Sequence, residues 1–168
     1  MPDLRLNCSL SIPYPDVNSA DLNRYDTQMI RTLLARKLRT INEYITQSVV
    51  LAHDYGALAD IIDCIAVIET RHFKLLGRLL LLSGESVGVQ SLAQSFNGRS
   101  ARNQNGRVNK LPLAFINANL ESERASASDY RLVLSQVHDA SAKALLERIL
   151  ADEEHHADIF ANLRSRYS

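Results

Sequence analysis

The chain has no net charge and no long apolar run. Nineteen basic and nineteen acidic residues cancel over 168 residues. There is therefore no basic field of the kind that attracts nucleic acid or an anionic membrane surface. No segment approaches the length of uncharged apolar sequence that a membrane span requires. We expect neither nucleic acid nor a membrane as a partner.

Cysteine is also scarce, with only Cys8 and Cys64. The two cysteines lack the spacing of a metal-binding pair, and Cys64 lies beside the apolar face of a helical pattern, where a small buried thiol is the commoner role. We expect no disulfide. The first ten residues include an acidic residue and lack the apolar run of a secretory signal, which favours a cytoplasmic protein.

What the chain does contain is four helical stripes of apolar residues. Leu58, Ile62, Ile65, Leu76 and Leu79 recur at spacings that place them on one face of a helix. Similar stripes run through residues 30–51, 113–137 and 146–163. The length suits one domain with a substantial core. The pattern predicts an all-α four-helix bundle.

Prolines and glycines suggest the boundaries. Three prolines between residues 2 and 15 exclude a regular helix at the start, so we expect an extended arm over residues 1–19 and the bundle over residues 20–168. Ser19 or Asp21 is expected to cap the first helix, which runs to about His53, and the second ends near Ser83.

The apolar rhythm stops between residues 85 and 110, where three glycines appear among polar residues. This segment is expected to be a long crossover between the second and third helices, which is typical of ferritin-like bundles. Pro112 can open the third helix, and Asp139 or Ser141 can cap the fourth.

Each stripe is interrupted near its middle by ionisable residues. At the estimated midpoints these residues share one level of the bundle, so they are expected to converge. A buried, uncompensated charge costs several kcal/mol, on the order of half a small domain's stability. Two inward Glu-x-x-His pairs and a further Glu are the ligand types of a two-metal bundle site. The interrupting residues are Lys37, Glu69, His72, Glu123, Glu153 and His156.

Iron or manganese suits mixed carboxylate and imidazole ligands, and zinc also fits. The alternative is a metal-free network in which Lys37 and the two imidazoles balance the carboxylates. Tyr44 and Tyr130 lie seven residues after Lys37 and Glu123 on the same seams. Their hydroxyls could support the carboxylates by hydrogen bonding, or the two rings could simply fill the core.

The segment from about Asn23 to Leu163 resembles the ferritin-like superfamily, in particular rubrerythrin, bacterioferritin and manganese-catalase-like proteins. The resemblance implies metal-ligand roles for Glu69, His72, Glu123, Glu153 and His156, with one or two bound ions. The sixth ligand would be a Glu at position 37, where this chain has Lys. The matching residues are Tyr44, Glu69 to Phe73, Leu75 to Gly77, Glu123, Tyr130 and Asp152 to His156.

Three possibilities follow for Lys37. A protonated Lys37 could replace the charge of one metal ion and hydrogen-bond Glu69 or Glu153, leaving a site for a single ion on Glu123, Glu153 and His156. A deprotonated Lys37 could itself bind metal. A local helix irregularity could instead turn Glu43 inward. We favour the first.

Three functions remain open at this stage. The first is an oxidoreductase that uses iron or manganese with dioxygen or peroxide, as the resemblance implies, with Lys37, Tyr44 and Tyr130 as candidate catalytic residues. The second is a storage protein, and the third is a metal-free bundle that binds partners. Leu80, Leu81 and Val133 lie off the seams, and we expect them to form an exposed apolar face and hence a homodimer.

Overall fold

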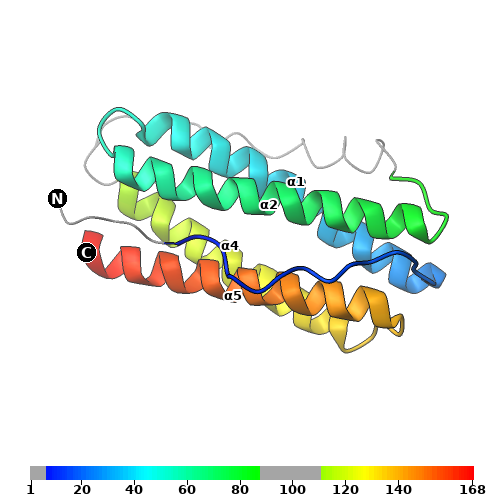
Figure 1. Cartoon of the computed structure of the whole chain (residues 1–168). Coiled ribbons are helices and arrows are strands. Elements are labelled where there is room, and N and C mark those ends of the chain that lie inside the picture. Colours follow the sequence, from blue (N-terminus) through cyan, green and yellow to red (C-terminus); the bar gives the residue numbers. More distant parts are fainter. Residues whose placement is uncertain (1–6, 88–110) are drawn as a thin grey trace.

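The computed structural model describes residues 7–87 and 111–168, which form a bundle of four long helices (Figure 1). Helix α1 packs mainly on α2, and α4 mainly on α5, so that two antiparallel hairpins face each other. The predicted all-α four-helix architecture is confirmed. Within the described ranges, no helix offers the apolar length that crossing a membrane would take. The helices are α1 (Arg24–Leu51), α2 (Gly56–Leu82), α4 (Leu111–Leu134) and α5 (Ala140–Tyr167).

The first helix begins later than the sequence suggested. Its cap is Asn23, whose side-chain oxygen accepts hydrogen bonds from the backbone N–H groups of Tyr25 and Asp26. The prediction of Ser19 or Asp21 is wrong, because the backbone N–H of Asp21 instead donates to Asp139 and the chain stays extended to that point. Asp139 caps α5, as predicted, by accepting from the backbone N–H of Ala142.

The apolar core is divided into two clusters. One contains Tyr44, Ile62 and Phe160, and the other contains Ile30, Leu76 and Ile149. The ionisable residues in the middle of the helices come between these two groups along each helix. The predicted stripes are therefore real core faces, each carrying polar groups at its centre.

The N-terminal arm, defined here as residues 7–22, runs without regular helix along α5 and reaches α2 (Figure 1). Cys8 in this arm forms a disulfide with Cys64 in α2, so the expectation of no disulfide is wrong. The spacing of two cysteines indicates only local pairing, and it carries no information about where an extended arm meets a helix. The predicted crossover lies outside the described residues apart from positions 85–87.

Two of the three residues named for the apolar outer face are not exposed. Leu80 and Val133 are buried in the second core cluster, and Leu81 alone of the three is exposed. Two helices in a hairpin bury a wider stripe than one seam, which explains the difference. These residues no longer support a dimer, and the dimer itself stays a prediction.

The Asn23 cap is open to a direct test. Asn23→Ala removes the acceptor for two N–H groups and should lower the free energy of unfolding by about 1 kcal/mol. Urea unfolding followed by circular dichroism measures it. Asn18→Ala is the control, because the Asn18 amide contacts only Asp16 in an exposed part of the arm. Equal effects of the two substitutions would contradict the capping role.

Candidate metal centre

All six interrupting residues meet in the middle of the bundle, as their shared level predicted. Each of the four helices contributes at least one of them, and every one of these side chains is at most 1% exposed. The six are Lys37 from α1, Glu69 and His72 from α2, Glu123 from α4, and Glu153 and His156 from α5.

Lys37 lies between two carboxylates. Its Nζ is 2.6 Å from Oε2 of Glu69 and 2.5 Å from Oε2 of Glu153. Burial by itself disfavours the charged amine, but the charges of Glu153 and Glu69 outweigh burial and hold the pKa of Lys37 well above its ordinary value. This geometry matches the protonated alternative. Glu43, by contrast, is exposed and does not reach the site.

Four side chains are arranged as a possible metal-binding set. Glu69, Glu123, Glu153 and His156 each offer one ligand atom, and these atoms all lie within 4.8 Å of one another. Within the described part of the chain, Oε1 of Glu69, Oε1 of Glu153 and Nδ1 of both His72 and His156 are buried without a hydrogen-bond partner. Because buried polar atoms are normally satisfied, these orphaned acceptors fit a metal cation.

The two histidines are held by their outer nitrogens. Nε2 of His72 is 2.9 Å from Oδ2 of Asp152, and Nε2 of His156 is 3.1 Å from the carbonyl oxygen of Cys8. Both partners are acceptors, so Nε2 carries the hydrogen and Nδ1 is the atom directed at the carboxylates. Nδ1 of His72 is 3.2 Å from Glu153, and Nδ1 of His156 is 3.4 Å from Glu69.

Charge is distributed unevenly among the carboxylates. Burial, together with the charges of Glu153 and Glu69, raises the pKa of Glu123 well above its ordinary value. For Glu69 and Glu153 burial acts in the same direction, but Lys37 and the neighbouring imidazole groups outweigh it and lower the pKa. Without metal, Glu123 is therefore the carboxyl of the three that takes up a proton most readily.

The same carboxylates favour the protonated form of His72. Burial lowers its pKa, but hydrogen bonds to Asp152, Glu153 and Glu69 outweigh burial and raise the pKa to about 10. A metal cation at Nδ1 would have to take the place of that proton, since the metal-binding imidazole is neutral.

No role near His72 was assigned from the sequence to Asp152, Tyr14 or Arg148. Asp152 accepts from the Tyr14 hydroxyl at 2.5 Å and pairs with Arg148 at 2.6 Å. The Tyr14 ring also lies against the guanidinium groups of Arg71 and Arg148. The position of Asp152 directly before Glu153 was a usable signal. Tyr14 lies in the aperiodic arm, where no pattern pointed to it.

The two tyrosines differ. The Tyr44 hydroxyl donates a hydrogen bond to Oε1 of Glu123, so it contacts a candidate ligand, but one on another helix and not on its own seam. The hydroxyl of Tyr130 is buried with no partner among the described residues, and Nζ of Lys37 lies 5.4 Å from its ring centroid. Burial first of all raises the pKa of both hydroxyls well above the ordinary value, so both are neutral.

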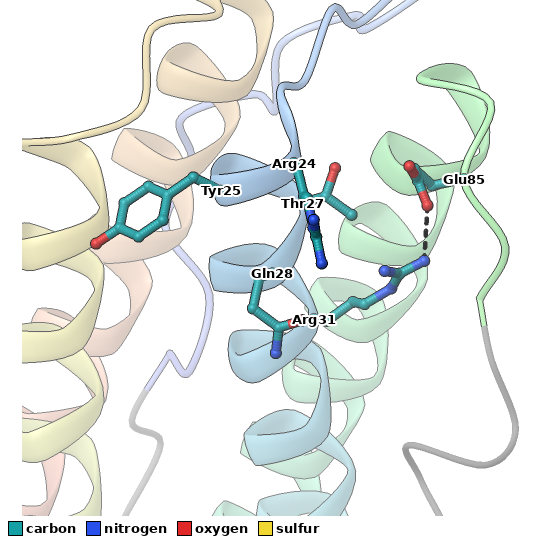
Figure 2. Close-up of a pocket in the computed structure, with 6 residues that line it drawn as sticks. All are labelled: Arg24, Tyr25, Thr27, Gln28, Arg31 and Glu85. Carbon is teal, nitrogen blue, oxygen red and sulfur yellow. Dashed lines mark hydrogen bonds and ion pairs between the residues drawn. The ribbon is translucent and has the colours of Figure 1, made fainter.

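A surface pocket lies elsewhere, at the start of α1. It is lined by polar side chains of that helix and by Glu85, which pairs with Arg31 at 2.8 Å (Figure 2). None of the six central residues lines it. The metal-binding set is enclosed in the bundle and is separate from this pocket.

Comparison with solved structures supports the fold. A Desulfovibrio desulfuricans bacterioferritin, described with a diiron site, matches with a TM-score of 0.67 and 23% identity over 84% of this chain and 78% of its own. KatB, a manganese catalase from Anabaena, matches with a TM-score of 0.69 and 20% identity over 94% of this chain and 79% of its own. No family model and no curated protein matches the sequence.

At these identities the likeness establishes a ferritin-like fold, and the site is defined by this chain's own residues. The protein is therefore a ferritin-like helical bundle with a buried Glu/His cluster that could hold metal.

The ion pairs of Lys37 predict a large effect on stability. Lys37→Met leaves Glu69 and Glu153 buried without their cation. The free energy of unfolding of the metal-free protein should fall by about 3 to 5 kcal/mol. Urea unfolding in the presence of a chelator measures this.

The matched control is Arg36→Met, one residue earlier. Arg36 pairs with Asp129 on a partly exposed face, so its loss should cost less than about 1 kcal/mol. If both variants lose the same small amount, Lys37 does not neutralise the buried carboxylates.

Proposed function

We propose that the protein binds one ion of iron or manganese through Glu69, Glu123, Glu153 and His156, and that it acts as an oxidoreductase on dioxygen or peroxide. The observation that carries the proposal is the convergence of orphaned acceptors on Glu69, Glu153 and His156. Carboxylate and imidazole ligands together suit iron and manganese. The set contains four of the five ligands expected from the sequence, without His72, and it adds Glu69 to the single-ion site expected with a protonated Lys37.

Lys37 is the reason for proposing one ion instead of two. Its ammonium holds one oxygen of Glu69 and one of Glu153, so these oxygens are not free to hold a second ion. A second cation beside Lys37 would meet like charge at close range in a site of low polarity. His72, whose half of the site contains Lys37, then serves as an internal charge partner.

The choice of substrate rests on enclosure. The central side chains are at most 1% exposed, so only molecules of the size of dioxygen or peroxide would reach them without large rearrangement. Bound iron or manganese would supply the one-electron chemistry that such substrates need. The two comparison proteins are described as a diiron bacterioferritin and a manganese catalase, which supports these two metals.

The chain's own residues have separate tasks in this proposal. Tyr44 holds Glu123 in place through its hydroxyl. The neutral Tyr130 hydroxyl has no partner among the described residues, and the Tyr130 ring lies near Nζ of Lys37; this hydroxyl can donate a hydrogen bond to a bound molecule. Lys37 stays protonated and keeps the Glu69 and Glu153 carboxylates from repelling each other.

One observation favours a second function, that of a metal-free structural bundle. With Glu123 neutral, the cations Lys37, His72 and Arg148 equal in number the anions Glu69, Glu153 and Asp152. The cluster is thus electrically balanced without metal. A protonated His72 would satisfy Oε1 of Glu153 at 3.2 Å. Oε1 of Glu69 and Nδ1 of His156, two buried acceptors 3.4 Å apart, stay unpaired in this alternative, which is why we prefer the first function.

Metal analysis separates the two functions. The purified chain, loaded with ferrous iron or with manganese and then desalted, should retain about one ion per chain. Lys37→Glu supplies the missing carboxylate and removes the competing cation, so it should retain about two. Elemental analysis gives the stoichiometry, and Glu153→Gln should abolish tight binding.

Lys74→Glu is the matched control for charge, because Lys74 is exposed on the same bundle and this substitution should leave one ion bound. No metal under any loading condition would support the metal-free function. One ion in both the wild type and Lys37→Glu would contradict our account of position 37.

The tyrosines provide a second test. Tyr44→Phe removes the donor to Glu123 and should weaken manganese binding by about tenfold or more, as does loss of other ligand-supporting hydrogen bonds. Tyr130→Phe removes a hydroxyl that contacts no ligand and should leave affinity unchanged while lowering turnover of peroxide. Equal affinities for all three proteins would argue against a supporting role for Tyr44.

A homodimer and a cytoplasmic location belong to the proposal as well, both carried over from the sequence. The disulfide between Cys8 and Cys64 argues against the cytoplasmic location, because disulfides are rare in the reducing cytoplasm. In that compartment Cys8 and Cys64 would be expected as thiols.

A further inference from the structure

The two candidate ligand histidines are supported in different ways. His72 on α2 donates to Asp152, which directly precedes Glu153 on α5. The corresponding position on α2, directly before Glu69, is Ile68, which has no acceptor. His156 instead uses the backbone carbonyl of Cys8. One histidine is therefore held from within the bundle and the other from the N-terminal arm.

The arm is docked over this part of α5 by consecutive residues. The carbonyl of Asn7 lies 2.7 Å from Nε2 of His155, and the carbonyl of Cys8 follows with His156. Farther along the arm, Arg148 donates to the carbonyl of Ile12 at 2.8 Å. These contacts align the arm with α5. Those made by Asn7 and Cys8 are hydrogen bonds to backbone carbonyls and not bonds between two side chains.

The disulfide supplies the firm attachment at that point. It joins Cys8 to Cys64, with a Cα–Cα distance of 6.2 Å, and Cys64 lies on α2 five residues before Glu69. The residue that presents its carbonyl to His156 is thus the same residue that is covalently tied to the opposite helix. A covalent tie holds a carbonyl that a single hydrogen bond to an extended chain would leave free to move.

We infer that Cys8 is a positioning residue for His156, and that the Cys8–Cys64 disulfide keeps His156 oriented for metal binding. This inference deepens the proposed function and rests on it for the metal. With the tie in place, the Cys8 carbonyl keeps the hydrogen on Nε2 and leaves Nδ1 directed at Glu69. When the tie is cut, the first part of the arm can leave, and His156 loses the acceptor that fixes its ring and its tautomer.

Cys8 is buried, whereas Cys64 is at an exposed position on α2. We expect a small dithiol to reach the disulfide from the Cys64 side and to attack the Cys64 sulfur. The dithiol gives up two electrons and two protons and becomes a disulfide itself, and Cys8 and Cys64 become thiols. The redox state of this pair would therefore set the affinity of the site for metal.

The experiment compares oxidised wild type, Cys64→Ser and Cys8→Ser, all as the full chain. The probe is Mn²⁺, with free ion measured by electron paramagnetic resonance during titration. Loss of the tie should weaken binding by about tenfold to a hundredfold, the range found when a support of a metal ligand is removed. Wild type reduced with dithiothreitol and freed of it should match the variants, and reoxidation should restore the affinity.

A second readout follows the histidine itself without metal. The ring ¹⁵N signals of His156 should change on reduction or in Cys64→Ser, whereas those of His72, held by Asp152, should not. Val67→Ser, at an exposed position three residues after Cys64, controls for a surface change on α2. Circular dichroism at the titration temperature establishes that each variant is folded, and the reduced wild type replaces any variant that is not.

The outcomes separate the two claims. If the oxidised wild type binds Mn²⁺ and the reduced form binds equally well with unchanged His156 signals, the inference is wrong and the proposed function stands. If the oxidised wild type binds no metal, the proposed function fails. In that case His156 signals that change on reduction still support the positioning role of Cys8, and unchanged signals overturn it.

Discussion

The ion pairs of buried Lys37 with Glu69 and Glu153 are the constraint on which the rest of the site depends. Two carboxylates at the centre of an apolar bundle are costly unless a cation accompanies them, and Lys37 satisfies one oxygen of each. Their other oxygens stay unpaired among the described residues and face the imidazoles. One half of the centre is thus neutralised by Lys37, whereas in the other half Oε1 of Glu69 and Nδ1 of His156 face each other as unpaired acceptors.

The helix hairpins differ at the two positions that decide this asymmetry. Where α4 places Glu123, α1 places Lys37, and where α5 places Asp152, α2 places Ile68. The half that contains His72 therefore has a cation in place of a ligand, and its imidazole is strongly hydrogen-bonded and tends to be protonated. The half that contains His156 keeps the Glu123 carboxylate, and its imidazole is oriented by the neutral carbonyl of Cys8. Both differences favour metal at His156.

Helix patterns predicted the bundle and the six central residues because a seam has a fixed period, so an ionisable residue on it must face inward. They could not predict what the aperiodic arm contacts. Tyr14 and Cys8 meet residues more than fifty positions away, and nothing local in the sequence encodes such pairings. The same limit explains the missed disulfide, while Leu80 and Val133 were misplaced because a hairpin buries more than one stripe.

The arm is the least regular part of the described chain, yet it supplies a hydrogen-bond partner to residues around both histidines. Tyr14 donates to Asp152 behind His72, and the Cys8 carbonyl accepts from His156. The Tyr14 ring also lies against two guanidinium groups, whereas the covalent attachment of the Cys8 end is its disulfide to Cys64. A change at that bond therefore acts on the half of the centre that still needs a cation, and leaves the half neutralised by Lys37 intact.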